Sequence, residues 1–377
     1  MQVCSLALLI GCQGSVGVER GGADSHADTD VDTDADTGSG ADTGADTDEE
    51  PDGPPAGLVL YTTGDDGDAD GGLGGPLLLA MGGGPEVDTA FGVAFAELGA
   101  PGDVVVLRTS GSDGYNDYLY DEIGGVDSVQ TLLLTSRALA DDPWVAWRIR
   151  HAEVVWMAGG DQSKHVERWG AEMWAGTATA AAIRQVVDRG GLVGGTSAGA
   201  AVLGELVYTA RVGSASSAEA LADPYSADVT VEPGFLGLEG GVGLTQAALF
   251  DTHFAERDRM GRLTVFLARA LQDGLHTAPV GLGLDERTAL LVRMGGDGGA
   301  VGEVFGEGAV HVVVPSEVPE RCEAGAPLEF SGLTTTALRA GGQVQLPSGA
   351  TDGTAVPLSV QGGVVSPADP YRSGSAL

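Results

Sequence analysis

The stretch GLVGGTSAGAAVLGE, residues 191–205, decides how this chain folds. It begins apolar, places two glycines and a threonine before Ser197, and continues as an alanine-rich run. This order predicts a buried strand, a sharp turn that carries Ser197, and a helix that begins just after the turn. Residues 195–199 also fit G-x-S-x-G, the pattern around many serine nucleophiles. Ser197 is therefore the first candidate for a catalytic residue.

The pattern around Ser197 leaves two interpretations open. The chain contains 62 glycines in 377 residues, so a match to five positions is weak evidence by itself. A serine that only caps the N-terminus of the following helix would explain the strand, turn and helix equally well. A nucleophile needs a base to take the hydroxyl proton and an acid to orient that base. The decision therefore depends on the rest of the chain.

The globular part repeats this alternation of strand and helix. Short aliphatic runs ending in glycine or polar residues predict strands in residues 57–63, 76–84, 103–111, 129–136, 152–161 and 190–199. Amphipathic stretches predict helices in residues 86–99, 141–152 and 177–190. Strands that are apolar on both faces and separated by helices form a parallel sheet covered on both sides. We predict an α/β fold with a doubly wound, mostly parallel sheet and a ligand site at the carboxyl ends of its strands.

Composition divides the chain into four parts. Residues 57–292 hold the predicted strands and helices and form the main α/β domain, and the 43% apolar content of the chain is enough for its core. Residues 293–377 are rich in β-formers and turns, which predicts a small C-terminal β appendage and a weakly ordered tail. Residues 13–56 form an acidic tether, and residues 1–12 the remnant of a secretion signal.

The acidic tether explains much of the net charge of −35. Between Asp24 and Asp52 the chain has twelve acidic residues, no Lys or Arg, and one large aliphatic residue, Val31. Such a segment buries too little apolar surface to fold, and its charges repel one another. Its Asp-Thr repeats lack the central glycine and bidentate glutamate of a calcium-binding EF-hand loop. The negative charge also argues against a nucleic-acid partner.

The first twelve residues predict an extracytoplasmic protein. The apolar run Leu6 to Ile10 is too short to span a membrane, but it fits the end of a secretory signal. LIGC, residues 9–12, resembles a bacterial lipobox, in which Cys12 would be lipidated and would anchor the chain to a membrane. The alternative is an unstructured N-terminus with two incidental cysteines. Only Cys322 lies in the globular part, which excludes an internal disulfide and a cysteine zinc site there.

The globular part offers several partners for Ser197. It contains five histidines, and His253 alone follows an apolar strand-like run and precedes an arginine-rich stretch. His151 and His276 lie near helix ends, where a capping role is the simpler interpretation. Asp285 and Glu286 follow another apolar run, and a buried carboxylate there needs a cation or an imidazole beside it.

The candidate residues lie in four motifs that follow one another along the chain: VVWMAGGDQ, GGTSAGAAV, DTHFAERDRMGRL and GLGLDERTALLV. Over residues 77–292 the chain closely resembles the cyanophycinases, serine peptidases related to peptidase E. The resemblance implies a fold like the class I glutamine amidotransferases, with Ser197 as nucleophile, His253 as general base and Glu286 as third triad member. It also implies substrate binding by Gln162, Asp251, Arg257, Arg259 and Arg262, and a homodimer. The alternative for the three arginines is local pairing with Glu256, Asp258 and Asp251 on a solvated helix. No cofactor is expected.

The chemistry of these residues agrees with that resemblance. Ser197 would attack a peptide carbonyl, His253 would carry the proton to the leaving amine, and Glu286 would stabilise the imidazolium. The backbone N–H groups of Gly160 and Ala198 are candidate oxyanion donors. The substrate implied is cyanophycin, a polyaspartate with arginine on its β-carboxyls, which the family cleaves to β-aspartyl-arginine dipeptides.

Three observations keep other functions open. Thr252 stands where the family has glutamine, so another aspartyl or isoaspartyl peptide is an alternative substrate. An α/β-hydrolase esterase shares G-x-S-x-G, but its acid precedes its histidine in sequence. A non-catalytic surface binding protein could keep the same scaffold.

Two further segments have no definite role in the site. The tyrosines of residues 115–125 either line the pocket or pack on a surface helix. The stretch MGGGPE, residues 81–86, is rich in glycine but lacks the ending of a phosphate-binding loop.

Overall fold

The computed structural model describes residues 49–372, except 70, 169–170, 173–175, 235, 237–242 and 297. The predictions for Cys12, the signal remnant and most of the acidic tether fall outside the described residues. No helix among the described residues is long and apolar enough to cross a membrane. In the same part of the chain, no three His, Cys, Asp or Glu side chains are grouped to hold a metal ion.

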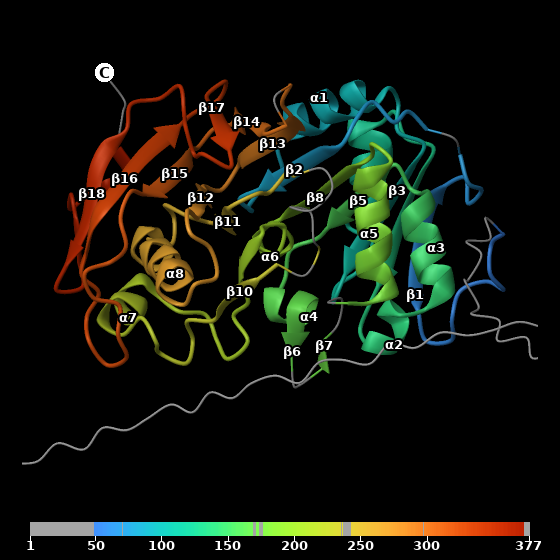
Figure 1. Ribbon diagram of the computed structural model, residues 1–377. Helices are drawn as coiled ribbons and strands as arrows, with labels where there is room; N and C mark the ends of the chain where they lie inside the picture. Colours follow the sequence, from blue (N-terminus) through green and yellow to red (C-terminus); the bar gives the residue numbers. More distant parts are fainter. Residues whose placement is uncertain are drawn as a thin grey trace, which may run out of the picture. The chain divides into compact units, whose positions relative to one another are not determined.

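A nine-stranded sheet forms one half of the described domain (Figure 1). Its five central strands run parallel, in the order β4, β3, β5, β8, β2, and antiparallel strands extend both edges. The predicted doubly wound α/β architecture is confirmed. In spatial order the strands are β1(Val59–Gly64), β4(Ser128–Leu133), β3(Asp103–Arg108), β5(Val154–Met157), β8(Leu192–Thr196), β2(Leu77–Met81), β13(Thr288–Met294), β14(Ala300–Gly306) and β17(Gln343–Leu346).

Helices cover both faces of this sheet because its central strands are apolar on both faces. Alternate side chains of β2 point to opposite sides: Leu79 packs in the core beneath α1(Asp88–Leu98), and Leu78 in the core beneath α3(Pro143–His151) and α5(Ala178–Asp188). Two of the three predicted helices begin at side-chain caps that the sequence supplies. Asp142 caps α3, which has proline at its first position, and Thr177 caps α5.

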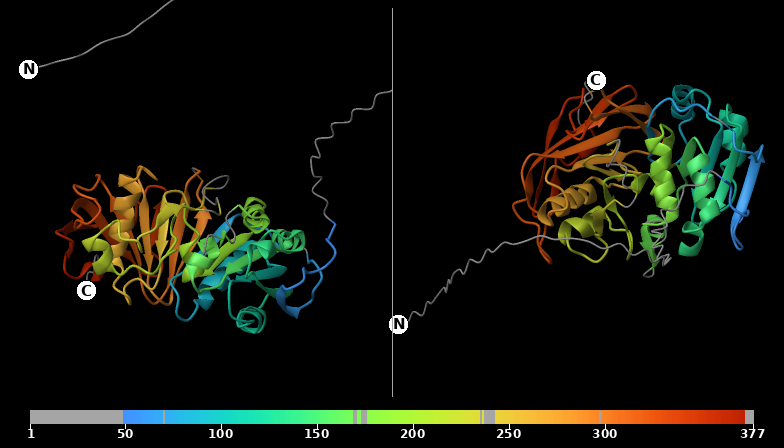
Figure 2. Two further views of the ribbon diagram at one scale, coloured as in Figure 1. Left: turned by 90° about the horizontal axis from the view of Figure 1, so that it is seen from below. Right: turned by 45° about the vertical axis from the view of Figure 1, so that its right-hand side comes forward.

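An eight-stranded mixed sheet forms the other half of the described domain (Figure 2). The helices α7(Ser217–Ala222) and α8(Met260–Gln272) pack against one face of it, and its other face shares the core of the first sheet. In spatial order its strands are β10(Val231–Pro233), β9(Leu206–Tyr208), β11(Ala248–Asp251), β12(Val280–Leu284), β15(Val310–Pro315), β16(Phe330–Leu338), β18(Val356–Gln361) and β19(Val364–Ser366).

The remaining elements are short and lie in the connections. They are the π-helix η1(Tyr118–Ile123), α2(Arg137–Ala140), α4(Gln162–Val166), the strand pair β6(Glu167–Arg168) and β7(Ala171–Glu172), α6(Ala198–Ala201) and the 3₁₀-helix η2(Pro370–Arg372).

The strands after residue 292 are more closely integrated than an appendage. β14 and β17 continue the first sheet, whereas β15, β16, β18 and β19 continue the second. Their β-forming residues and turns identified these strands as β structure, but pairing partners depend on register and on distant strands, which local pattern does not encode. Because β15 pairs directly with β12, the C-terminal extension lies one strand away from β11, the strand that leads to His253.

Candidate active site

Ser197 lies on a strained turn between β8 and α6. Its φ of 51° and ψ of −117° are unfavourable for a residue with a side chain. The glycines on either side allow this turn. A methyl group on Gly199 would lie 2.0 Å from the carbonyl oxygen of Met157, and one on Gly195 would lie 2.7 Å from the backbone of Gly199. The G-x-S-x-G match therefore has a steric reason and is not an accident of a glycine-rich composition.

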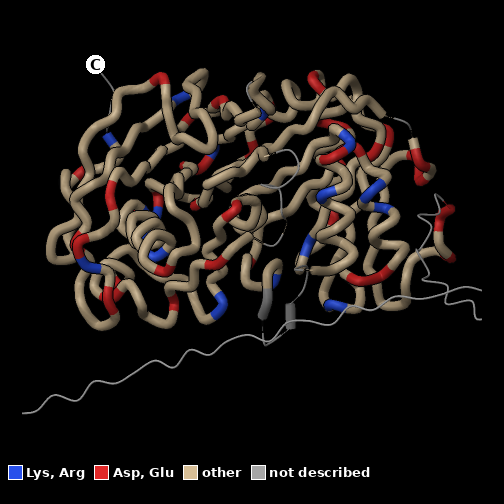
Figure 3. Tube along the Cα trace, viewed as in Figure 1, with Lys and Arg blue, Asp and Glu red and all other residues tan. Residues whose placement is uncertain are grey.

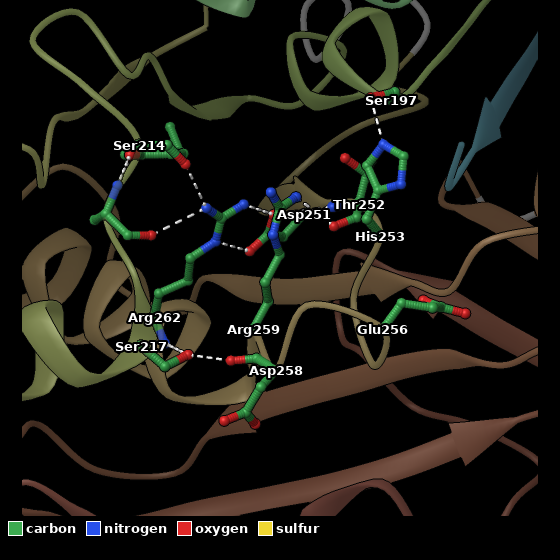
Figure 4. A network of polar contacts seen from close by, with 12 residues as sticks. Ser197, Ser214, Ser217, Asp251, Thr252, His253, Glu256, Asp258, Arg259 and Arg262 are labelled. Atoms are coloured by element: carbon green, nitrogen blue, oxygen red, sulfur yellow. Dashed lines mark hydrogen bonds and ion pairs between the residues drawn. The ribbon is translucent and has the colours of Figure 1, made fainter. Parts of the chain in front are cut away.

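The side chains of Ser197, His253 and Glu286 form a continuous relay. The hydroxyl oxygen of Ser197 lies 2.7 Å from Nε2 of His253, and Nδ1 of His253 lies 2.7 Å from Oε1 of Glu286. Figure 4 shows the first of these contacts. An ionised carboxylate only accepts hydrogen bonds, so Nδ1 carries the ring proton and Nε2 is free to accept from the serine. The Ser197 side chain makes no capping bond to α6, which answers the N-cap alternative.

One loop, Met81 to Gly83, holds the backbone of all three segments. Its consecutive carbonyl groups accept N–H bonds from Ser197 at 3.0 Å, from His253 at 2.8 Å and from Arg287 at 2.9 Å. A methyl group on Gly83 would lie between 2.4 and 3.0 Å from three atoms of the His253 ring. No function of this loop was predicted from the sequence. Three successive glycines directly after a buried strand were the signal for a close backbone approach.

The electrostatics favour a neutral base beside an ionised acid. Burial lowers the pKa of His253 below its ordinary 6.5, although the hydrogen bond to Glu286 works against this shift. The same hydrogen bond lowers the pKa of Glu286, which keeps its carboxylate ionised. At neutral pH the imidazole can therefore accept the serine proton.

A pocket of about 280 Å³ lies beside Ser197. Gly160, Gln162 and Ala198 line it, so both candidate oxyanion donors and one candidate substrate-binding residue lie at the nucleophile. Arg257 and Arg259 line another part of its wall. Basic residues are sparse along the described chain (Figure 3), with 19 Lys and Arg against 54 Asp and Glu in the sequence, so two arginines at one pocket are a local exception. The remaining lining residues are Asp161, Ala210, Val212, Gly213, Ser214, Thr252 and His253.

Contrary to the prediction from the sequence, Asp251 and Arg262 do not lie where they could bind the substrate directly. Neither lines the pocket, and each is only 2% exposed. Nε of Arg262 donates to Asp251 at 2.7 Å, and Nη1 donates to Ser214 at 3.3 Å and to the carbonyl of Ala215 at 3.2 Å (Figure 4). A guanidinium whose N–H groups already donate to protein acceptors is unable to bind a substrate carboxylate. Arg262 and Asp251 instead connect Ser214 in the pocket wall to β11, the strand that leads to His253.

Arg259 combines both roles. Its Nη1 donates to the carbonyl of Thr252 at 2.6 Å and lies 3.5 Å from Asp251, while the side chain still reaches the pocket. Burial lowers the pKa of Arg259 to about 10, so it is protonated at neutral pH. Arg257 is exposed, and no hydrogen bond or ion pair of its side chain is found among the described residues. The sequence predicted the same substrate-binding role for all three arginines, because sequence alone does not show which of them the fold buries.

The other histidines lie elsewhere. Nε2 of His311 lies 3.3 Å from Asp285, and Nε2 of His276 lies 3.8 Å from Glu205 in a separate surface groove. Asp285 thus has the imidazole partner that its burial requires. An esterase arrangement based on His276 or His311 has no support in this geometry.

The tyrosines of residues 115–125 pack beneath the sheet edge and do not line the pocket. The hydroxyl of Tyr118 donates to Asp88 at 2.7 Å, and Tyr115 donates to Glu86. Both rings lie near Phe91 or Trp156. Of the two interpretations of this segment, helix packing is the one that the structure supports.

Comparison with known proteins agrees with this site. Residues 116–296 match the model of peptidase family S51, a segment that includes Ser197, His253 and Glu286. The chain is also similar to several cyanophycinases. It is 29% identical over 205 residues to the cyanophycinase of Synechococcus elongatus, which covers 54% of each chain, and 28% identical over 233 residues to that of Trichormus variabilis, which covers 60% of this chain and 68% of the relative. The chain thus spans about half the length of the first of these relatives.

Two solved structures are also similar to this chain. A peptidase from an acI-B1 actinobacterium aligns with 72% of this chain and 97% of its own, at 20% identity and a TM-score of 0.46. A putative peptidase E protein from Listeria monocytogenes aligns with 62% of this chain and 98% of its own, at 15% identity and a TM-score of 0.38.

Replacing Gly83 by alanine is expected to reduce hydrolysis on the order of 10²-fold, because the added methyl group displaces the His253 ring from its hydrogen bonds. Gly99→Ala is the matched control. Gly99 has a similar φ of 85°, and its Cβ would meet no atom within 4 Å. Initial rates and thermal melting of both variants separate the two effects. Equal activity losses in the two variants would show that backbone strain, and not contact with the imidazole, is responsible.

The pH profile follows from the direction of the His253 pKa. A protonated imidazole is unable to accept the serine proton, so kcat/KM is expected to rise with pH through an apparent pKa below 6.5 and then level off. Initial rates between pH 4 and 8, with circular dichroism at each pH to confirm folding, measure this. A rising limb centred above 6.5 would contradict the neutral buried imidazole.

Proposed function

We propose that this chain is a serine peptidase that hydrolyses cyanophycin or a closely related aspartate-rich peptide and releases β-aspartyl-arginine dipeptides. The observation that supports it most directly is the relay of two 2.7 Å contacts through Ser197, His253 and Glu286, next to a pocket with two arginines. The similarity to cyanophycinases supports the choice of substrate.

The proposed reaction proceeds in two transfers of the acyl group. As Oγ of Ser197 attacks the scissile carbonyl carbon, its proton moves to Nε2 of His253, and Glu286 stabilises the resulting imidazolium. The imidazolium then protonates the amide nitrogen as the C–N bond breaks, which leaves an acyl-enzyme. Water, deprotonated by His253, attacks the ester and regenerates Ser197.

The pocket supplies binding and charge stabilisation for these steps. The backbone N–H groups of Ala198 and Gly160 would donate to the oxyanion of the tetrahedral intermediates. Arg257 and Arg259 would bind substrate carboxylates, because a guanidinium matches a carboxylate with two parallel hydrogen bonds. Gln162 would donate to or accept from the substrate at the part of the pocket that Gly160 and Ala198 line. The relay itself argues against a protein that only binds.

The short side chain of Thr252 favours a second candidate substrate. It lines the pocket, and a short hydroxyl there leaves space that the family's glutamine would fill. A different aspartyl or isoaspartyl peptide is therefore the alternative within the same reaction class.

We further propose an extracytoplasmic location, with secretion or a lipid anchor at Cys12, on the basis of the N-terminal motif. We also propose a homodimer, on the basis of the family resemblance.

Loss of either end of the relay should abolish turnover. Ser197→Ala and Glu286→Gln are each expected to reduce hydrolysis on the order of 10³-fold or more, since the nucleophile or the orientation of the base is lost. Purified wild type and variants are incubated with cyanophycin and with isoaspartyl dipeptides, and the products are identified by mass spectrometry. Glu307→Gln is the control, because this exposed carboxylate pairs with Arg287 at 3.0 Å and does not line the pocket. A wild type that releases no dipeptide from any of these substrates would overturn the proposal.

Removal of the exposed pocket cation should affect binding more than chemistry. Arg257→Gln is expected to raise KM for an aspartate-bearing substrate about tenfold and to change kcat less, because one charge-assisted hydrogen bond is lost. Arg287→Gln is the matched control, since this arginine is exposed, close to Glu286 in sequence, and absent from the pocket lining. Steady-state kinetics on both variants give the two parameters. An unchanged KM in Arg257→Gln would exclude a contact with the substrate carboxylate.

A further inference from the structure

The turn of residues 253–259 carries both the base and the pocket arginines, and it is strained at two points. His253 has φ 45° and Asp258 has φ 49°, both in the left-handed region that side chains disfavour. Asp258 stands between Arg257 and Arg259, which both line the pocket. The conformation of Asp258 therefore sets the directions in which its two neighbours leave the backbone.

Tyr371 holds this turn from the far end of the chain. Its hydroxyl donates to Oδ1 of Asp258 at 2.9 Å and accepts from the backbone N–H of Met260 at 2.9 Å. Met260 is the first residue of α8, and Arg259 at the N-cap position makes no side-chain capping bond. A phenol hydroxyl 111 residues away thus supplies the acceptor that an N-cap serine or aspartate provides elsewhere.

The ring of Tyr371 is fixed as well as its hydroxyl. It packs edge-on against His311, with centroids 5.4 Å apart, and against Phe254, with centroids 5.9 Å apart. His311 in turn contacts Asp285, which accepts from the N–H of Ala255 at 3.0 Å. Burial raises the pKa of Tyr371, so the hydroxyl stays protonated and remains a donor. The C-terminal extension therefore contacts the turn at Phe254, Asp258 and Met260.

Tyr371 lies outside residues 116–296, the segment that matches the peptidase family model. We propose that Tyr371 is a positioning residue for substrate binding: through Asp258 it fixes the turn that presents Arg257 and Arg259 to the carboxylates of the substrate. The proposal rests on the function proposed above. It assigns the C-terminal extension a part in the active site, in addition to its part in the two sheets.

A tyrosine with only a structural role makes a different prediction, and the chain offers a matched control. The hydroxyl of Tyr225 donates to Asp273 at 2.6 Å, at the C-terminal end of the same helix α8. Tyr225→Phe and Tyr371→Phe each remove one tyrosine to aspartate hydrogen bond at an end of α8. Only Tyr371→Phe removes it from the turn that carries the pocket arginines.

The test compares two covalent probes of Ser197 on the full chain. An uncharged alkyl fluorophosphonate reports the relay alone, whereas a phosphonate that bears an aspartyl side chain also needs the arginines. Tyr371→Phe is expected to react with the uncharged probe at the wild-type rate and with the aspartyl probe about fivefold more slowly, through weaker binding and not through slower bond formation. Tyr225→Phe is expected to match the wild type with both probes.

Asp258→Ala removes the same contact from the other side. It is expected to reproduce the selective loss, because it removes the hydrogen bond from Tyr371 to Asp258 and leaves the bond from the Met260 N–H to the Tyr371 hydroxyl in place. The double variant should lose little more of the aspartyl-probe rate than Tyr371→Phe alone, because the two changes share the bond to Asp258. These variants keep the test valid if Tyr371→Phe folds poorly.

Two results would overturn the positioning role: equal losses with both probes, or no loss with either. A wild-type chain that neither probe labels would instead overturn the proposed peptidase function, and the positioning role with it. Labelling of the wild type by the uncharged probe, lost in Ser197→Ala, distinguishes these cases.

Discussion

Three consecutive carbonyl groups, those of Met81, Gly82 and Gly83, are the constraint on which the site depends. Each accepts an N–H from a different segment: the turn of Ser197, the residue His253 itself, and Arg287 next to Glu286. Hydrogen bonds between backbones have narrow distance and angle preferences, so one loop sets the mutual positions of three distant segments. Gly83 also lies directly against the imidazole ring. The loop serves as a common reference for nucleophile, base and acid.

This arrangement also connects the two sheets. Ser197 follows β8 of the first sheet, and His253 follows β11 of the second. Glu286 lies in the short connection where the chain passes from β12 in the second sheet to β13 in the first. The relay therefore bridges the junction of the sheets, and the shared core between them holds the side chains in register. The carboxyl ends of the strands provide the open edge at which such a site can form.

The sequence predicted those features that depend on local pattern. Buried strands, capped helices and the turn of Ser197 follow from runs of apolar residues and from glycines at fixed positions. The sequence left open whether the arginines after His253 bind substrate or pair with nearby acids such as Asp251, because an arginine next to a carboxylate in sequence can face solvent, substrate or core, and only the fold decides. The role of Gly83 was missed for a similar reason: its contact with His253 spans 170 residues. The C-terminal strands were recognised as β structure, but their membership of both sheets depends on long-range register.

The steric demand at Gly83 limits which substitutions this chain can accept over evolutionary time. Since any side chain at position 83 would meet the imidazole, and any at position 199 would meet Met157, the floor of the site tolerates almost no substitution. The pocket wall at Val212 is the opposite case, because its side chain is 67% exposed and packs against little. New substrate preferences can arise there without disturbing the relay. The fold thus separates an immutable reaction centre from an adaptable rim.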